Sequence, residues 1–230
     1  MFIDHPEGNT KLRTKMLHLH PIKNQASPYW DSLVRIYLQS FPINEQRPVE
    51  SIAHLLNEEP RYTMYAIVDD NYAAELQAVD HCPLAVGSRD DENCTAELQT
   101  QSQQAIANSP KALGLLTTWH FEEFIYIEHF AIDPALRSQG YGSEALKAFI
   151  HELDKPLVLE AEPPTDEMTH RRIRFYERID LTLYDYPYIQ PAYTEESLPV
   201  KLRLMGTIDT ETIPLDKVSD TLHREVYGCK

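Results

Sequence analysis

The sequence predicts an α/β fold, because strand-like and helix-like segments alternate along most of the chain. A glycine-rich turn, RSQGYG, separates a β-branched and aromatic run from a helix-like run. After that helix, PLVLEA is a short, continuously apolar segment, typical of a strand buried in a parallel pairing. A length of 230 residues suits one such domain with an insertion.

Ahead of the glycine-rich turn, residue patterns predict a lead-in, two helices and three strands. Residues 1–26 are polar and irregular, so we predict no regular structure for them. Apolar side chains at helical spacing predict one helix that Pro42 stops and a second, shorter helix before residue 60. Runs rich in β-branched and aromatic residues predict strands at 61–70, 112–121 and 124–132.

A long insertion is predicted at residues 71–111, between the first two of these strands. The segment is rich in Gln, Ser and Asn and carries more acidic than basic residues. A mobile surface loop is one interpretation of such a segment, and a lid over a substrate is the other.

Behind the glycine-rich turn, helix-like and strand-like segments alternate again. In order, we predict a helix at 143–153, a strand at 156–161, a helix at 166–179, strands at 181–189 and 200–205, and a helix at 215–227. No repeat stands out and nothing after residue 130 resembles a linker. We therefore predict a single domain over residues 1–230, with a core at about 27–206 and a C-terminal helical extension at about 208–230.

Composition and charge argue against several classes of function. The formal net charge of −15 leaves no basic stripe for a nucleic-acid backbone, and no run approaches the ~18 apolar residues of a membrane span. The three cysteines show neither metal-site spacing nor a disulfide framework, and the first residues lack the apolar core of a signal peptide. We expect a cytoplasmic protein that binds no metal, no nucleic acid and no membrane; a homodimer stays open.

The glycine-rich turn predicts an anion site. A glycine-rich turn that opens a helix presents unpaired N–H groups and the positive end of the helix dipole, and Arg137 adds a charge. A phosphate or pyrophosphate group is the expected ligand. Residues 140–145, GYGSEA, also satisfy the dinucleotide pattern G-x-G-x-x-A, with Glu160 about 20 residues further on. That fold is disfavoured, because the first glycine lies too far behind the strand and too few residues follow Glu160.

A different interpretation accounts for more residues. The stretch IEHFAIDPALRSQGYGSEAL resembles the acetyl-CoA motif of the GNAT superfamily of N-acetyltransferases, whose R/Q-x-x-G-x-G/A core corresponds to residues 137–142. Downstream, RFYERI is similar to the family's Phe-Tyr-Glu segment. The resemblance implies a GNAT-like acyl-CoA N-acyltransferase fold, a mixed twisted sheet flanked by helices. The chain departs from the family at Asp180 and Leu181, where Gly-Phe is usual, and at Arg171 and Arg172.

The resemblance also implies acetyl-CoA as co-substrate and a set of residues that bind it. Backbone N–H groups of Ala131 and Ile132 are expected to hold the thioester carbonyl and the pantetheine arm. The diphosphate is expected at Arg137, Ser138, Gln139, Gly140, Tyr141, Gly142 and Ser143.

Glu128 is the candidate general base. Strand alternation predicts that Tyr126, Glu128 and Phe130 share one face, and GNAT enzymes with a side-chain base often carry it near this point. Alternation directs His129 to the opposite face, where we expect a packing role.

Three further side chains are candidates for proton transfer. Glu160 and Glu162 follow the next strand and are alternative bases. Tyr176 matches the GNAT tyrosine that lies near the cofactor sulfur, which implies a role as the acid that protonates the leaving thiolate.

Acceptor binding is expected at Phe41 and Glu45, between the first two helices, in a region that the GNAT family commonly uses for this purpose. Tyr126 and Tyr186 complete the predicted acceptor residues. Tyr186 belongs to the run YDYPYIQPAY, which predicts an aromatic wall on one strand face.

We predict an N-acetyltransferase that moves an acetyl group from acetyl-CoA to a primary amine on a small molecule. A protein or peptide N-acetyltransferase is the enzymatic alternative. A catalytically weak acyl-CoA-binding regulatory module is the third interpretation, suggested by the altered segment after RFYE and by the acidic insertion.

Overall fold

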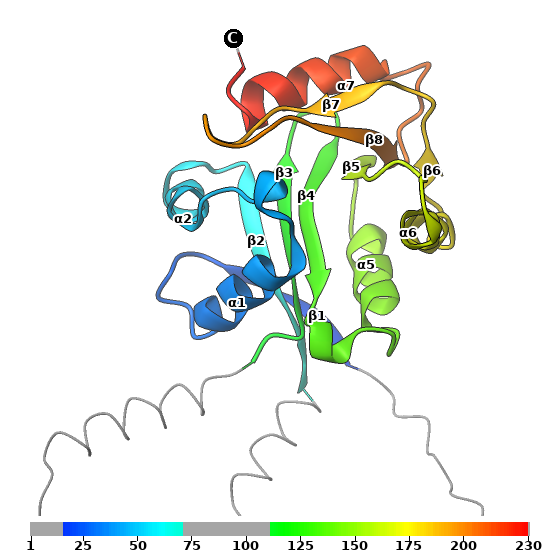
Figure 1. Ribbon diagram of the computed structural model, residues 1–230. Coiled ribbons are helices and arrows are strands. Elements are labelled where there is room, and N and C mark those ends of the chain that lie inside the picture. The colour runs from blue at the N-terminus through cyan, green and yellow to red at the C-terminus, as the bar shows by residue number, and fades with distance from the viewer. Residues whose placement is uncertain (1–15, 71–110, 230) are drawn as a thin grey trace, which may run out of the picture.

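A mixed, eight-stranded sheet organises the part of the chain that the computed structural model describes, residues 16–70 and 111–229 (Figure 1). The strand order is β1-β2-β3-β4-β5-β8-β6, and β7 also pairs with β8. Among the strands described, β4 and β5 are the only neighbours that pair in parallel. The strands are β1 (Leu17–Ile22), β2 (Tyr62–Asp69), β3 (Gly114–His120), β4 (Ile125–Ile132), β5 (Leu157–Ala161), β6 (Thr182–Leu183), β7 (Tyr188–Gln190) and β8 (Val200–Gly206).

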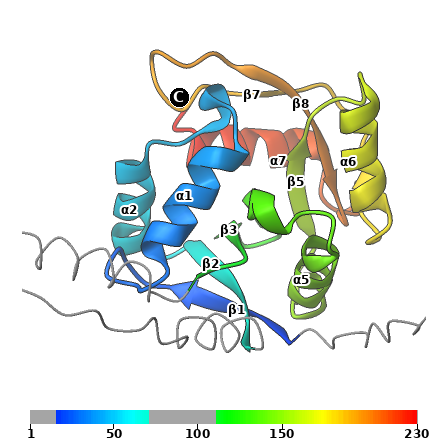
Figure 2. The ribbon, with the colours of Figure 1, turned by 60° about the horizontal axis from the view of Figure 1, so that its bottom comes forward.

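Two groups of helices cover the two faces of this sheet. α1 (Trp30–Ser40), α2 (Val49–Glu58) and α7 (Leu215–Thr221) contribute to one apolar core, and α5 (Tyr141–His151) and α6 (Glu167–Glu177) contribute to another. Figures 1 and 2 show α1 and α2 on the left of the strands, with α5 and α6 on the right. Strand side chains alternate between the two faces, which gives each face its own core. The predicted α/β class, with a mixed sheet flanked by helices, is confirmed.

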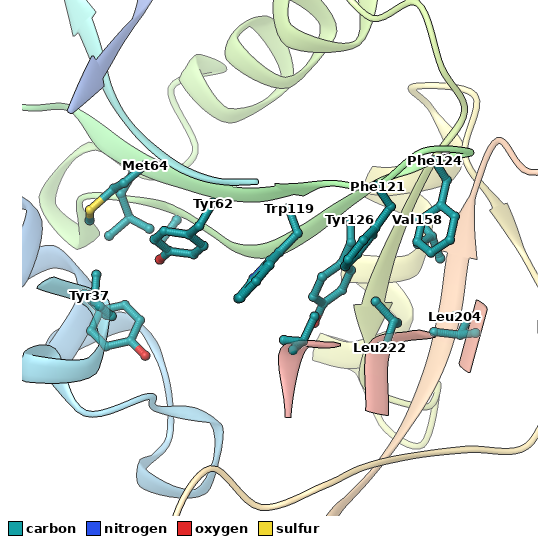
Figure 3. Packing of buried hydrophobic residues seen from close by; sticks show 14 of the residues in the cluster. Tyr37, Tyr62, Met64, Trp119, Phe121, Phe124, Tyr126, Val158, Leu204 and Leu222 are labelled. Carbon is teal, nitrogen blue, oxygen red and sulfur yellow. The ribbon is translucent and has the colours of Figure 1, made fainter. Parts of the chain in front are cut away.

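The larger core ties the C-terminal part of the chain to the middle of the sheet. Figure 3 shows Tyr62, Trp119 and Tyr126 in a row, between Tyr37 of α1 and Leu222, the residue that follows α7 in the sequence. These side chains are almost completely buried. Aromatic side chains contribute large buried apolar areas, so this row stabilises the packing of the C-terminal segment (residues 215–229) against β3 and β4.

Three predicted segments differ from the structure. Residues 17–22 of the predicted irregular lead-in form β1, which pairs antiparallel with β2. The single strand predicted at 181–189 is two short strands, β6 and β7, since Pro187 between them lacks the N–H that a continuous ladder needs. The predicted terminal helix ends at Thr221 and continues as one π-helical turn, Leu222–Val226. The predicted insertion, apart from Lys111, lies outside the described residues.

A β-bulge in β4 removes Glu128 from the regular alternation. β3 and β4 are paired on both sides of Glu128, but Glu128 itself has no partner residue on β3. Tyr126 consequently belongs to the core under α1 and α7, whereas Phe130 packs against the core under α5 and α6. The prediction that Tyr126, Glu128 and Phe130 share one face is wrong, because the extra residue shifts the alternation. His129 lies on the face of Tyr126, with its ring against Tyr37.

The two parallel strands at the centre of the sheet meet only over a short seam. β4 pairs with β5 at Ile125–Ile127 and Leu157–Leu159. Beyond these positions the two strands are not paired, and both line a cleft. The cleft therefore has a seam end, next to Glu128 and Glu160, and a turn end, where the glycine-rich turn follows β4.

Candidate active site

The cleft between β4 and β5 has a volume of about 830 Å³. Residues 127–132 of β4 line one wall and residues 159–162 line the other. The glycine-rich turn, α6, the connection between α1 and α2, and Gln190 on β7 complete the lining. The elements that carry the predicted site residues thus converge on one cavity.

Backbone conformation prepares the glycine-rich turn for an anion. Ser138 and Gly140 both have left-handed backbone, with φ of 64° and 87°, and Gly140 caps the start of α5. Left-handed residues in such a turn direct successive N–H groups toward one side, which forms an anion-binding concavity in front of the helix. A left-handed serine is strained, and strain of this kind is typical of ligand-binding loops.

Side chains around the turn hold it in place. The Arg137 guanidinium donates from Nε to the Ile132 carbonyl at 3.2 Å and from Nη2 to Ser40 Oγ at 2.9 Å. Tyr141, the first residue of α5, is 6% exposed and packs its ring in the core. Six of the seven predicted turn residues line the cleft; Gln139 does not.

Backbone amides of β4 also face the opening. The Asp133 N–H donates to the Leu113 carbonyl at 2.8 Å, so the pairing of β4 with β3 is fixed at this end. Because N–H groups alternate in direction along a strand, the amide of Ala131 points to β3. The amides of Phe130 and Ile132 point toward the cleft. The geometry therefore favours Phe130 over Ala131 as a backbone donor, beside the predicted Ile132.

Glu128 is enclosed by donors. Arg47 donates to its Oε1 from Nε at 3.0 Å and Nη2 at 2.8 Å, Tyr193 Oη donates to Oε1 at 2.9 Å, and Trp119 Nε1 donates to Oε2 at 2.8 Å. Burial alone would raise the pKa of Glu128, but the Arg47 charge and the hydrogen bonds from Trp119 and Arg47 hold it below the ordinary value. Glu128 lines the cleft as an ionised, fully bonded carboxylate.

His129 is a buried link between β4 and the α1–α2 connection. Its Nε2 lies 3.1 Å from the Glu45 carbonyl and its Nδ1 lies 3.2 Å from Thr117 Oγ1. Burial lowers the pKa of His129 despite the nearby Glu128, so the ring is neutral. A carbonyl can only accept, which assigns the proton to Nε2 and makes Nδ1 the acceptor from Thr117. Both ring nitrogens are therefore engaged in structural contacts.

Glu160 lies at the seam end of the cleft within a group of tyrosines. The hydroxyl of Tyr188 donates to Oε1, and the hydroxyl of Tyr227 lies 3.1 Å from Oε1 and 2.9 Å from Oε2. Tyr126 Oη is 3.0 Å from Tyr227 Oη. Burial raises the pKa of Glu160 to about 7, although the tyrosine hydrogen bonds oppose that rise and Glu128 adds to it. Glu160 can therefore exchange a proton near neutral pH.

Tyr227 was not among the predicted site residues. It follows the π-helical turn, and Arg47 Nη2 donates to the carbonyl of the preceding Val226 at 3.0 Å. No motif marks Tyr227 in the sequence, and only the apolar pattern of the predicted terminal helix indicated that this segment packs onto the domain. The C-terminal segment thus reaches the same carboxylate as β7.

Tyr176 lines the cleft from α6 and is 8% exposed. Burial raises the pKa of its hydroxyl further above the ordinary value, with Glu162 in the same direction and Arg172 opposed. The hydroxyl therefore keeps its proton at neutral pH and can donate it.

The predicted acceptor residues separate into two pairs. Phe41 and Glu45 line the cleft. Tyr126 and Tyr186 do not line it in the described structure: Tyr126 is fully buried, and Tyr186 packs against the core under α7. The predicted aromatic wall therefore does not form at Tyr186, because the strand is interrupted there.

Two carboxylates and an arginine interact where Glu45 lines the cleft. Burial and the charge of Glu162 raise the pKa of Glu45, while Arg172 opposes them. Arg172 is also paired with Glu162. Arg172 is thus shared by two carboxylates, which can attract a cationic ligand to this part of the cleft.

The chain matches the model of the acetyltransferase (GNAT) family over residues 30–180, more than half of its length. It belongs to the GNAT acetyltransferase family. A GNAT-family protein from Bacteroides thetaiotaomicron is similar in structure, with a TM-score of 0.71, 29% identity and coverage of 93% of this chain and 99% of that chain. Arabidopsis thaliana NAA60 in complex with acetyl-CoA shares the fold, with a TM-score of 0.51, 13% identity and coverage of 84% and 98%. The comparison with curated proteins gives no match.

As a GNAT acetyltransferase, the chain uses acetyl-CoA as its acetyl donor. The left-handed turn, the start of α5 and the inward amides of Phe130 and Ile132 fit a diphosphate and a pantetheine arm laid along β4. Within residues 16–70 and 111–229, no group of three or more His, Cys, Asp or Glu side chains could hold a metal ion. None of the helices described there is long and apolar enough to cross a membrane.

Proposed function

We propose that this GNAT enzyme acetylates a primary amine on a small molecule, with Glu160 as the general base and Tyr176 as the general acid. The observation that carries the proposal is the environment of Glu160. The Glu160 carboxylate lies at the seam end of the cleft and is hydrogen-bonded to two tyrosine hydroxyls. The pKa of Glu160 is about 7.

The reaction requires an uncharged amine. An alkyl amine with a pKa near ~10.4 is neutral in about one molecule in ~10³ at pH 7, equivalent to ~4–5 kcal/mol. Acetyl-CoA supplies the activated acetyl group as a thioester. Glu160 accepts a proton from the ammonium group, and the neutral nitrogen attacks the thioester carbonyl carbon to form the C–N bond. The Phe130 N–H donates to the carbonyl oxygen as negative charge develops on it. The C–S bond then breaks, and the nitrogen loses its second proton to solvent. Tyr176 Oη donates its proton to the departing sulfur.

Glu160 suits the role of base better than Glu128. A base that works near neutral pH is most effective with a pKa near that pH, which is the case for Glu160. Glu128 accepts four hydrogen bonds, two of them from Arg47, and its pKa is lowered. Taking up a proton would leave Arg47 buried without its counter-charge, which is costly. We assign Glu128 a positioning role, holding Arg47 and Tyr193.

Contacts across the seam end support a small acceptor. Tyr193, in the loop between β7 and β8, has its ring 4.6 Å from the Arg47 guanidinium carbon. In the same loop, the Leu198 N–H donates to Asn44 Oδ1 at 3.3 Å, in the α1–α2 connection. A polypeptide passing between these two loops would have to separate them. A small amine would not, so we favour it over a protein or peptide acceptor.

Thiol release from acetyl-CoA tests this function. The assay compares polyamines, aminoglycosides, amino acids and short peptides as acceptors, with Glu160→Gln and Tyr176→Phe as variants. We expect saturable release with a small amine and severe loss in both variants, with the acetyl-CoA-induced rise in Tm retained. Release only with peptides would contradict the small acceptor. Binding of acetyl-CoA without release for any acceptor would favour the regulatory module.

A further inference from the structure

Gln190 is a buried side chain with an unused hydrogen-bond acceptor. It lies on β7, is 3% exposed and lines the active-site cleft. Its Oε1 has no hydrogen-bond partner in the described structure. Buried polar atoms are rarely left unpaired, because the cost of removing them from water is then not recovered. A buried, unpaired amide oxygen on a residue that lines a binding cleft indicates a donor that arrives with a ligand.

The strand geometry places this oxygen near the proposed base. Gln190 and Tyr188 lie two residues apart on β7, about 7 Å along the strand and on the same face. The Tyr188 hydroxyl bonds Glu160. Leu202, the partner of Tyr188 on β8, also lines the cleft. Gln190 and Glu160 are therefore two polar side chains of one cleft, linked through β7 and Tyr188, and the apolar Leu202 side chain lines the same cleft.

We propose that Gln190 Oε1 accepts a hydrogen bond from a second N–H or O–H group of the acceptor, so that the enzyme selects primary amines that carry such a donor a few bonds from the reacting nitrogen. This inference rests on the proposed function. An acceptor bound at both points presents its amine to Glu160 and its second donor to Gln190. An otherwise equal amine without that donor leaves Oε1 unpaired and loses both affinity and orientation.

The class of acceptor follows from the charges around these two points. Glu45 and Glu162 both line the cleft close to Arg172, and carboxylates there favour an acceptor that arrives as an ammonium ion. Short diamines and amino alcohols satisfy both requirements: a cationic amine that can lose a proton and a second donor for Gln190. An amine whose second group only accepts hydrogen bonds does not, because Oε1 offers it no proton.

Three amines that share a propylamine chain test the inference. Aminopropanol carries a terminal hydroxyl, methoxypropylamine carries an ether that can only accept, and n-butylamine carries neither. The measurement is kcat/KM for thiol release from acetyl-CoA, expressed per neutral amine so that the amine pKa values do not bias the comparison. For the wild-type chain we expect aminopropanol to exceed both other amines by about tenfold.

Gln190→Met keeps the side-chain length but removes the amide. In this variant we expect the preference for aminopropanol to disappear, so that the ratio of the kcat/KM values is about one, while kcat/KM for n-butylamine stays nearly unchanged. Ile189→Thr is the matched control, since Ile189 is the adjacent β7 residue and its side chain is 50% exposed; it should retain the tenfold preference. Tm and its rise with acetyl-CoA show whether both variants fold and bind the donor.

The outcomes separate this inference from the proposed function. Turnover of all three amines with equal efficiency in the wild type, or a preference that survives in Gln190→Met, would overturn the role of Gln190 and leave the acetyltransferase function standing. A preference for methoxypropylamine would overturn it too, since the side-chain NH₂ would then face the ligand. No release with any small amine while acetyl-CoA still binds would overturn the proposed function itself, and the role of Gln190 with it.

Discussion

Replacing Glu160 by Gln should increase stability at alkaline pH while removing activity. Burial raises the pKa of this carboxyl from 4.5 to about 7, so between these values the folded chain keeps a proton that the unfolded chain loses. The stability due to this proton is fully present below about pH 4.5 and is lost as the pH rises through 7. At 1.36 kcal/mol per pKa unit, the whole loss is about 3 kcal/mol. A glutamine has no such loss and can still accept from Tyr188 and Tyr227.

Urea unfolding at several pH values between about 4 and 9 measures the stability, and thiol release measures the activity. As the pH rises across this range, we expect the free energy of unfolding of Glu160→Gln to increase by about 3 kcal/mol relative to that of the wild type, so that the variant becomes relatively more stable. The variant should also lose about 10²-fold or more in kcat/KM. Glu177→Gln, an exposed change on α6, is the control. A wild-type rate without an inflection near pH 7, or an active Glu160→Gln, would refute the assignment of the base.

Three other variants probe the rest of the site. Glu128→Gln leaves the Arg47 charge without a counter-charge and should lower the free energy of unfolding by about 3 kcal/mol. The inflection of the rate near pH 7 should remain. Loss of that inflection in a variant that urea unfolding shows to be folded would point back to Glu128 as the base. Tyr227→Phe removes a donor that stabilises the ionised Glu160, so the inflection in kcat/KM should move above pH 7; an unchanged profile would separate Tyr227 from the base. Gly140→Ala forces a side chain into left-handed backbone with φ of 87° and should weaken acetyl-CoA binding about tenfold in a titration; unchanged affinity would argue against the turn as the anion site.

Local patterns were sufficient to predict most of the architecture. α1 and α2 follow from the helical spacing of apolar residues, and β5 follows from a continuous apolar run. Both patterns involve only residues that are close in sequence, so the sequence alone identifies these elements. β1 was missed although its LHLHPI sequence alternates apolar and polar residues over most of the strand, because so short an alternation next to polar residues is a weak signal. An edge strand depends on its pairing with β2, a contact that the local sequence does not record.

The candidate site was predicted where a motif encodes it. The glycine-rich turn is contiguous, and its residues converge on the cleft. The assignment of Glu128 rested on regular alternation, which the bulge in β4 breaks, and a bulge depends on the register with β3 rather than on composition. Tyr227 reaches Glu160, and Gln190 reaches the cleft, from segments distant in sequence, so no sequence spacing could place them at the site.

The opening between β4 and β5 gives one strand two kinds of backbone amide. In deuterated water, the amides of Ala131 and Asp133, directed to β3, exchange only when the sheet opens. Those of Phe130 and Ile132 face the cleft and exchange with solvent directly. Fast and slow deuteration thus alternate residue by residue along β4, and bound acetyl-CoA would slow the fast positions. The acetyl donor takes the place of a missing neighbouring strand, and the isotope pattern of β4 records whether that place is filled.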